Sequence, residues 1–370
     1  MSERDSRAAP RGRILILCPY PQGTAPSQRF RFEQYIPRLE AAGFEVVEDP
    51  FWSDEAWRIL YRPGHHAEKS LELARGFLRR LRAVLDARRF DWVFIHLEAT
   101  PIGPPIIEAM LFILGRKVVF DIDDAIFMPP PAERSKRLFS RLKWRSKVRW
   151  VARRADKVIA VNPFLVSWAR EVNEHTILVP TTIDPAYHRR PDDRPDNPVP
   201  VIGWTGTHST IRYLDMLRPV LERLGTRARF ELVVICDRDP GYSTIPGYRF
   251  VPWREASEIA DLSRLDVGLM PVLDEPWARG KVGFKAIQYS ALSIPPVVSD
   301  VGSGREVVED GVTGLVVPNH EAAWLEALEK LVVDRALRER LGAAARERIL
   351  STYSVPAQAP VYASLFGVEA

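Results

Sequence analysis

Two lysines in the second half of the chain are spaced to bind a negatively charged group. Lys281 and Lys285 lie four residues apart in WARGKVGFKAIQYSALSIPPVVSD (Trp277–Asp300), so within a helix they would share one face. Gly280 and Gly283 loosen the chain where such a helix would begin. A helix N-terminus attracts anions, and two ammonium groups beside it suit a diphosphate. We therefore predict that both lysines act on a diphosphate.

The stretch GWTGTHSTIRYL (Gly203–Leu214) is a second candidate for phosphate binding. Gly206 permits a tight turn at the end of a strand, and Thr207 and His208 bring a hydroxyl and an imidazole to the start of a helix. Backbone N–H groups, the helix dipole and small polar side chains together suit an oxyanion. We predict phosphate or sugar contact here, although a plain helix cap by a neighbouring Ser or Thr would explain part of the pattern.

The loop CPYPQGTAPSQRFRF, from Cys18, occupies the same kind of position in the first half. Its single glycine, Gly23, stands where the dinucleotide fingerprint needs three, and the chain has no Walker A lysine loop. Hydride transfer and P-loop chemistry are therefore disfavoured. Arg29 lies near the start of the following helix, where arginine favours anions. The loop is either a substrate-binding element or an ordinary strand–helix turn.

Acid–base side chains follow two neighbouring apolar runs of the first half. His96 ends one run, and Asp121, Asp123 and Asp124 lie at the end of the next. A lone histidine at a strand end is structural about as often as it is functional. Three acids within four residues could hold a metal, but we interpret Asp123 and Asp124 as acceptors for sugar hydroxyls or as a helix cap.

Short apolar runs rich in β-branched residues predict parallel strands that are buried on both faces. We expect helices between them, for example over Arg29–Ala42 and Leu71–Arg88, because apolar residues recur there at helical spacing. Two doubly wound α/β domains that face each other across a cleft follow from this alternation. The expected strands begin at Arg13, Glu45, Trp92, Lys117, Lys157, Thr176, Val201, Phe230, Tyr248, Val267, Pro295 and Gly314.

Length and composition agree with two domains. The chain has 370 residues, of which 46% are hydrophobic and 27% charged, as in ordinary soluble proteins. The stretch PAYHRRPDDRPDNPVP contains five prolines and few apolar residues, which is typical of a linker. We expect a disordered tail over 1–13, domains over 14–190 and 201–350, a linker over 191–200, and a C-terminal helix within 351–370 that packs back on the first domain.

The basic residues are concentrated in one segment. The formal net charge is only +4, yet residues 135–157 contain ten Lys or Arg against one acid, together with Trp144 and Trp150. Such a segment attracts polyanions. We predict contact with an anionic membrane surface, while a basic substrate groove and a plain solvated surface remain alternatives. Nucleic acid is disfavoured because no known nucleic-acid motif accompanies the charge.

Targeting and redox signals are sparse. The start MSERDSRAAPRGR lacks the apolar core of a secretory signal, and the longest strongly apolar stretch is far too short to span a membrane. Two cysteines, Cys18 and Cys236, provide neither a disulfide framework nor a metal cluster. We therefore expect a cytoplasmic protein.

Several stretches of the second half resemble a known family. GSGREVVEDGVTGLVVP, preceded by SALSIPPVVSD, is similar to the C-terminal hallmark of the retaining glycosyltransferases of family 4, which have the GT-B fold. YRFVPWREASEIADLSRLDVGLMPV and GWTGTHST extend the similarity, which covers Val201–Ile349 and is weaker in the first half. The resemblance implies a UDP-, GDP- or dTDP-linked sugar held by the second domain, an acceptor on the first, transfer with retention, and neither metal nor other cofactor.

The resemblance also assigns roles to individual residues. His96, Lys281 and Lys285 would be catalytic, and the lysines would face the donor diphosphate. The donor side would further include Gly206, Thr207, His208, Arg212, Trp253 near the base, and Gln288. The acceptor side would include Gly23, Arg29, Asp123 and Asp124.

The chain departs from the family at two acidic positions. The usual E-x7-E glutamates correspond to Gly280 and Gln288, and only Gln288 can hydrogen-bond a ribose. Asp274 or Glu275 could supply a displaced carboxylate, or could form a solvated turn. We predict a metal-independent glycosyltransferase that builds a polysaccharide, glycolipid or other glycan at the inner membrane face. The alternatives are a non-catalytic GT-B scaffold or sugar-nucleotide-binding subunit and, within the enzymes, a sugar-nucleotide epimerase.

Overall fold

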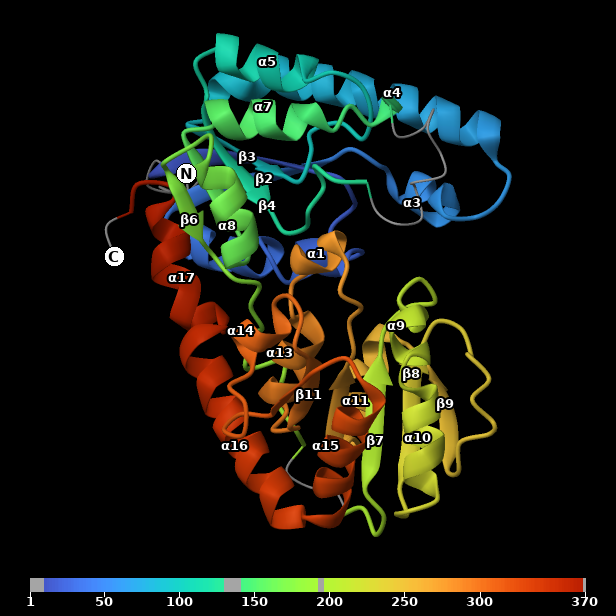
Figure 1. Cartoon of the computed structure of the whole chain (residues 1–370). Helices are drawn as coiled ribbons and strands as arrows, with labels where there is room; N and C mark the ends of the chain where they lie inside the picture. Colours follow the sequence, from blue (N-terminus) through green and yellow to red (C-terminus); the bar gives the residue numbers. More distant parts are fainter. Residues whose placement is uncertain (1–9, 130–140, 192–195, 369–370) are drawn as a thin grey trace, which may run out of the picture. The chain divides into compact units, whose positions relative to one another are not determined.

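The computed structural model describes residues 10–129, 141–191 and 196–368, and the chain divides into two compact units (Figure 1). The first unit contains the residues up to Pro180 together with Ala359–Ala370, and the second contains Thr181–Gln358. In the described part of the chain, each unit contains one six-stranded parallel sheet flanked by helices. The predicted α/β class with two doubly wound sheets is confirmed.

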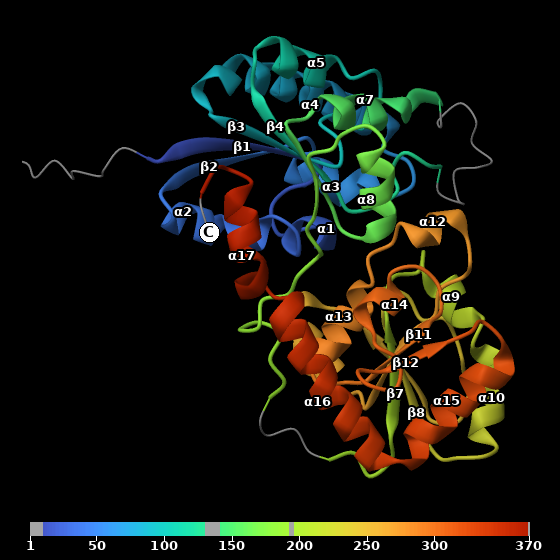
Figure 2. The same cartoon turned by 60° about the vertical axis from the view of Figure 1, so that its left-hand side comes forward.

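The first sheet has the strand order β2-β1-β3-β4-β5-β6. Its helices α4, α5 and α7 cover one face, as Figures 1 and 2 both show. The strands are β1 Gly12–Cys18, β2 Phe44–Pro50, β3 Trp92–His96, β4 Lys117–Ile122, β5 Lys157–Ala160 and β6 Thr176–Leu178. The helices are α1 Pro26–Arg29, α2 Ile36–Ala41, α3 Asp54–Leu60, α4 His66–Asp86, α5 Ile106–Ile113, α7 Ser146–Arg154 and α8 Pro163–Arg170.

The second sheet has the order β12-β11-β10-β7-β8-β9, in which the first strand of the unit lies at the centre beside the fourth. This is the strand order of a Rossmann fold. The strands are β7 Val201–Thr205, β8 Glu231–Cys236, β9 Tyr248–Pro252, β10 Val267–Met270, β11 Pro296–Ser299 and β12 Leu315–Val317. The helices are α9 Ile211–Asp215, α10 Arg218–Gly225, α11 Glu258–Ser263, α12 Pro276–Arg279, α13 Phe284–Ala291, α14 Gly304–Val307, α15 Glu321–Val333 and α16 Arg335–Thr352. The last helix, α17 Val355–Ser364, begins in the second unit, and from Ala359 on it belongs to the first.

Every strand expected from an apolar run is present within a few residues of its predicted start. The helix expected over Leu71–Arg88 is α4, with a short 3-10 turn after it. The single helix expected over Arg29–Ala42 is wrong, because α1, a 3-10 turn and α2 replace it. Pro37 lies in the first turn of α2, and proline has no N–H to continue a preceding helix.

The ends and the linker differ in detail from their predicted bounds. Residues 1–9 of the predicted tail and 192–195 of the predicted linker lie outside the described residues, while Gly12 and Arg13 already belong to β1. The second unit begins before residue 190, because the Ile183 N–H donates to the carbonyl of Tyr353 (2.9 Å). At the C-terminus, Tyr362 stacks on Tyr35 of the first unit at a centroid distance of 4.0 Å.

Candidate functional site

The central strands of the second sheet separate at their carboxyl ends. Strands β7 and β10 pair at Gly203 and Gly268, and beyond that point the Tyr289 hydroxyl joins them. It accepts a hydrogen bond from the Thr205 N–H (3.0 Å) and donates one to the Leu269 carbonyl (3.3 Å). A Cβ on Gly268 would lie 2.3 Å from the Tyr289 ring. Ligands of open α/β sheets bind at such a point, where the strand order reverses.

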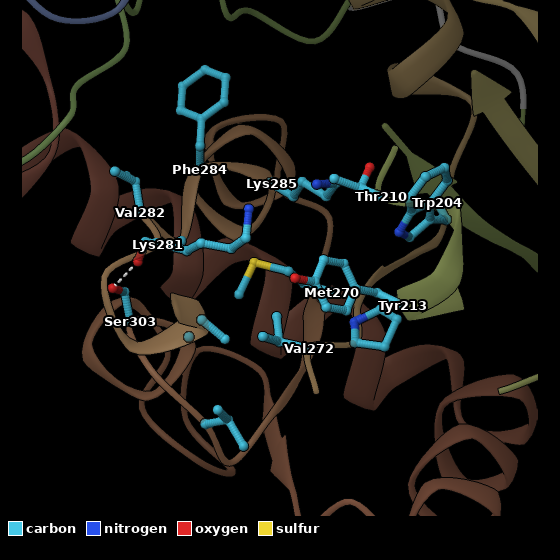
Figure 3. Close-up of a pocket in the computed structure, with 15 residues that line it drawn as sticks. Trp204, Thr210, Tyr213, Met270, Val272, Lys281, Val282, Phe284, Lys285 and Ser303 are labelled. Carbon is cyan, nitrogen blue, oxygen red and sulfur yellow. Dashed lines mark hydrogen bonds between the residues drawn. The ribbon is translucent and has the colours of Figure 1, made fainter. Parts of the chain in front are cut away.

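A pocket lies at this opening (Figure 3). It holds about 100 Å³ of space that water can enter, and none of its lining residues is Asp or Glu. The loops and helices that follow β7, β10 and β11 supply its walls. The lining residues are Trp204, Thr210, Tyr213, Met270, Pro271, Val272, Ala278, Lys281, Val282, Gly283, Phe284, Lys285, Val301, Ser303 and Gly304.

Both predicted lysines line this pocket, although they do not share a helix. Lys285 lies in the first turn of α13, whereas Lys281 precedes that helix in a loop. The expectation of one shared helix face is wrong, because α13 begins only after Gly283. The Ser303 hydroxyl donates to the Lys281 carbonyl and fixes that loop. Figure 3 shows both side chains extending into the same space.

Lys285 is held in an environment that disfavours its charge. Burial and the nearby Lys281 ammonium lower the pKa of Lys285 from 10.5 to about 8. Its Nζ lies 5.6 Å from the centroid of the Trp204 ring, a weak favourable contact for a cation. Within the described residues Lys285 has neither a hydrogen bond nor an ion pair that would offset the burial. A bound anion would supply the missing counter-charge.

The turn after β7 shapes the wall of the pocket, but most of the polar groups of this turn do not line the pocket. A Cβ on Gly206 would lie 2.3 Å from the Trp204 indole and 2.8 Å from the Thr210 hydroxyl, so the turn requires glycine. Thr207 and His208 are exposed, and neither lines the pocket. The His208 ring nitrogen Nδ1 and its backbone N–H both lie 2.6 Å from the Asp237 carboxylate.

Arg212 is engaged in an ion pair at the edge of the same region. Its guanidinium forks onto the Glu275 carboxylate, with N–O distances of 3.0 and 3.2 Å. Asp274 pairs with Arg279 at 3.6 Å. The carboxylates considered as replacements for the missing family glutamates are therefore both paired with arginine.

Gln288 and Trp253 meet at a buried carboxylate. The Gln288 amide (3.3 Å) and the Trp253 indole N–H (3.2 Å) donate to Glu258 Oε1, and the Tyr187 hydroxyl donates to Oε2 (3.2 Å). Gln288 is 4% exposed and does not line the pocket. These contacts turn both predicted donor-side residues toward α11 rather than toward the lysines.

In the first unit, His96 belongs to a buried charge network. Arg31 forms an ion pair with Asp121, and Asp121 Oδ2 accepts a hydrogen bond from His96 Nδ1 (2.7 Å). Burial alone would raise the pKa of Asp121, but the Arg31 guanidinium and the His96 bond hold it below its usual value. Because a carboxylate only accepts, Nδ1 of His96 carries a proton, and in the neutral ring the lone pair then lies on Nε2.

No part of His96 reaches the surface of the structure, and Nε2 has no hydrogen-bond partner among the described residues. Such an orphaned buried nitrogen is costly and calls for a function or an unseen partner. Phe32 lies edge-on to the imidazole at a centroid distance of 5.3 Å. The network thus fixes both the tautomer and the orientation of the ring.

The remaining predicted residues of the first unit are dispersed around this network. Asp123 is nearly buried, and burial raises its pKa above the usual value. Asp124 accepts a hydrogen bond from the Ala125 N–H (2.8 Å), as a turn-capping residue does. Gly23 has a positive φ of 76° and donates its N–H to Glu33 (2.9 Å). The Arg29 guanidinium lies over the Phe30 ring.

The sequence did not predict the observed roles of two important residues. Arg31 and Tyr289 each act through partners far along the chain, so their own neighbourhoods reveal little. A usable signal existed for Tyr289. Gly268, a glycine inside a strand, marks a place where a side chain approaches the backbone closely, and that side chain is Tyr289.

Comparison with solved structures defines the fold class. The chain superposes on the sucrose-phosphate synthase of Thermosynechococcus elongatus with a TM-score of 0.72 and 18% identity, covering 96% of this chain and 98% of that one. Anabaena Alr3699/HepE in complex with UDP-glucose gives a TM-score of 0.63 at 13% identity, with 95% and 98% covered. At these identities the match shows the fold alone, which is that of the GT-B glycosyltransferases.

Sequence comparison identifies the family. Residues 13–187 match the family described as Glycosyltransferase Family 4, and residues 199–334 match the one described as Glycosyl transferases group 1. The chain belongs to this family of glycosyltransferases.

Individual relatives align with only part of the chain. An alpha-maltose-1-phosphate synthase of Mycobacterium tuberculosis is 35% identical over 100 residues, which is 25% of this chain and 24% of the relative. A D-inositol 3-phosphate glycosyltransferase of Paenarthrobacter aurescens is 31% identical over 131 residues, 35% of this chain and 30% of the relative. The alignments therefore span about a quarter to a third of these relatives.

Proposed function

We propose that the protein transfers a sugar from a nucleoside-diphosphate donor to a hydroxyl acceptor, with retention at the anomeric carbon and without a metal. The observation that carries the proposal is the acid-free pocket at the β7–β10 opening, into which Lys281 and Lys285 extend. Family membership supports the reaction class. UDP and UDP-glucose in the Alr3699/HepE structures support the donor class.

The two lysines have a direct chemical role in this proposal. Cleavage of the bond between sugar and diphosphate leaves negative charge on the departing phosphate oxygen. Ammonium groups placed beside that oxygen stabilise the charge most as it develops. The N-terminus of α13, which begins at Phe284, adds its partial positive charge. Two protein cations thereby take the place that a divalent metal fills in other transferases.

The acceptor is assigned to the first unit. His96, with its proton fixed on Nδ1 by Asp121, offers Nε2 as an acceptor for a substrate hydroxyl once the surrounding chain opens. The exposed and half-buried residues Gly23, Arg29 and Asp124 stand near the carboxyl ends of β1 and β4, where substrates of such sheets bind. A glycan or lipid-linked acceptor at the inner membrane face fits this assignment.

Calorimetric titration with UDP-, GDP- and dTDP-glucose tests donor binding. We expect micromolar to submillimolar binding of one nucleotide class, lost in Lys285→Met and retained in Lys330→Met, which changes an exposed lysine paired with Glu326. Turnover should survive EDTA, and NMR of the product should show the donor's anomeric configuration. Loss of turnover in EDTA would refute the metal-free mechanism, and an inverted product would refute retention.

A non-catalytic scaffold is the second candidate. It is favoured by one observation: neither position of the family's acidic pair carries a carboxylate, and Gln288 binds Glu258 instead of facing the pocket. A scaffold would bind none of the donors at millimolar concentration. Binding without turnover across a panel of acceptors would indicate a sugar-nucleotide-binding subunit.

A further inference from the structure

Helix α4 carries an apolar stripe on the side that faces away from the sheet. The stripe residues recur at intervals of four and three, which places them in one line along the helix. All six are exposed, and the larger side chains remain 40–71% exposed. They are Ala67, Leu71, Ala74, Leu78, Leu81 and Leu85.

The opposite side of α4 is already packed. Val84 is fully buried, and Gly76 lies so close to Phe51 that a Cβ there would be 2.6 Å from its ring. The helix is therefore apolar on two sides. A helix that is apolar on both sides is normally covered on both. The outer side of α4 is covered by no described residue of the chain.

Neighbouring elements extend this apolar surface. Of the thirteen large hydrophobic side chains that are exposed in the described residues, eight lie on α4, α5 and residues 142–144. Helix α5 runs beside α4 in both views (Figures 1 and 2) and exposes Ile106 (60%) and Ile113 (83%). We call the exposed apolar side chains of α4 and α5 the α4–α5 face. So uneven a distribution marks an interaction surface rather than scattered surface residues.

The charges beside the stripe indicate what covers it. Residues 66–89 contain seven Lys or Arg against three acids. Arg80 is buried and pairs with Asp49, whereas Arg82 and Arg88 are exposed next to the leucines. Two of those acids, Glu72 and Asp86, already pair with arginines. A second copy of the chain would bring like charges together. Anionic lipid headgroups would neutralise the arginines while the leucines enter the acyl boundary.

We propose that the α4–α5 face docks the first unit on an anionic lipid bilayer. The basic segment over 135–157 contributes less than its composition predicts. Its residues 135–140 lie outside the described part, and several later bases are used within the unit. Lys147 is buried beside Glu98 (3.2 Å), Arg149 pairs with Glu171 (3.1 Å), and Lys157 donates to two carbonyls near the C-terminus. The leucines, not these bases, anchor the contact.

Vesicle co-sedimentation of the full chain tests the proposal without donor or acceptor, so its outcome is independent of transferase activity. With vesicles of phosphatidylcholine and 30% phosphatidylglycerol, we expect binding that weakens from 0.1 to 1 M salt. Leu78→Glu/Leu85→Glu should lower the partition coefficient at least about 30-fold, because each leucine loses its apolar burial and each glutamate is repelled. The control Val333→Glu changes a side chain that is 76% exposed in the second unit and should bind like the wild type.

A label on the stripe provides a measurement that does not depend on lost binding. Cys18 and Cys236 are both buried, so Leu81→Cys offers a single exposed thiol for an environment-sensitive fluorophore. Anionic vesicles should shift its emission to the blue, and nitroxide-labelled lipids should quench it. An unshifted label, equal binding by Leu78→Glu/Leu85→Glu, or loss of binding only in Arg153→Glu/Arg154→Glu would overturn the proposal. A wild-type dimer that becomes monomeric in the double variant and binds no vesicles would overturn it in favour of self-association.

Discussion

Replacing Lys285 with methionine should stabilise the protein while weakening its proposed function. Methionine keeps most of the length of the side chain in the pocket and removes the ammonium group. The wild type must bury that cation next to Lys281 with no ion pair among the described residues. Sites that bind charged ligands often carry such strain when empty.

The magnitude follows from the pKa. A Lys285 pKa of about 8, against 10.5 in an exposed lysine, corresponds to roughly 3 kcal/mol at neutral pH. This is an upper value, because the side chain keeps some contact with solvent. In a unit of this size, a change of that magnitude raises the melting temperature by about 6–12 °C.

The pH dependence of the stability difference distinguishes removal of the buried charge from a general improvement in packing. Below pH 8 both the folded and the unfolded chain carry the proton, so the full cost is present. Between about pH 8 and 10.5 the unfolded chain binds the proton and the folded chain does not, so wild-type stability rises with pH relative to the variant. The gap in melting temperature between Lys285→Met and wild type should therefore be largest near pH 7 and close toward pH 10.5.

Scanning calorimetry at pH 7 and 10 measures this gap, with Lys330→Met as the matched control. A saturating nucleoside diphosphate should raise the melting temperature of the wild type and not that of Lys285→Met, because only the wild type gains a counter-charge. A variant no more stable than wild type at pH 7, or a gap of equal size at both pH values, would refute the reasoning.

Three further substitutions test the surrounding structure. Arg31→Met should destabilise the first unit by about 3–5 kcal/mol in urea titrations, since it leaves Asp121 buried without its cation. Because the pKa of Asp121 is lowered, the stability it contributes should be present at neutral pH and be lost as the solution is acidified below about pH 4. Gly206→Ala should weaken donor binding roughly tenfold or more in calorimetry, because the new methyl displaces the indole that walls the pocket. Tyr289→Phe should cost about 1–3 kcal/mol by leaving the Thr205 N–H unpaired.

Each of these three substitutions is compared with a second variant. In a double-mutant cycle, Asp121→Asn should recover part of the loss caused by Arg31→Met, and purely additive losses would contradict a coupled pair. Ser209 lies in the same turn as Gly206, is exposed and does not line the pocket, and its hydroxyl contacts that of Thr207, so Ser209→Ala should leave donor binding unchanged. Tyr61→Phe removes a hydroxyl from a side chain that is 73% exposed, and a loss as large as that of Tyr289→Phe would indicate a nonspecific effect.

The sheets were predictable because their signal is local. A strand buried on both faces must be apolar over its whole length, and that run is visible without knowing its neighbours. The broken segment over Arg29–Ala42 was not predictable from spacing alone. Its apolar residues fit one helix, and only the position of Pro37 in the folded chain shows where the helix restarts.

The pocket was partly predictable for a related reason. Lys281 and Lys285 stand close together in sequence, so any compact loop-to-helix turn brings them together. His208 and Gln288 were assigned to the donor side by resemblance, but each binds a carboxylate from another strand or helix. Asp237 and Glu258 decide those orientations, and their positions depend on tertiary contacts that no local pattern reveals.

The composition of the pocket constrains its ligand more firmly than the identity of any single side chain. Two ammonium groups extend into a space whose lining residues include no carboxylate, and one of them has its pKa depressed by burial. A neutral ligand would leave that cost in place, and a cation would increase it. An anion with two separated charges relieves both lysines at once, as a diphosphate does. Because the gain comes from buried charge rather than surface attraction, donor binding should resist salt that weakens the docking of the α4–α5 face.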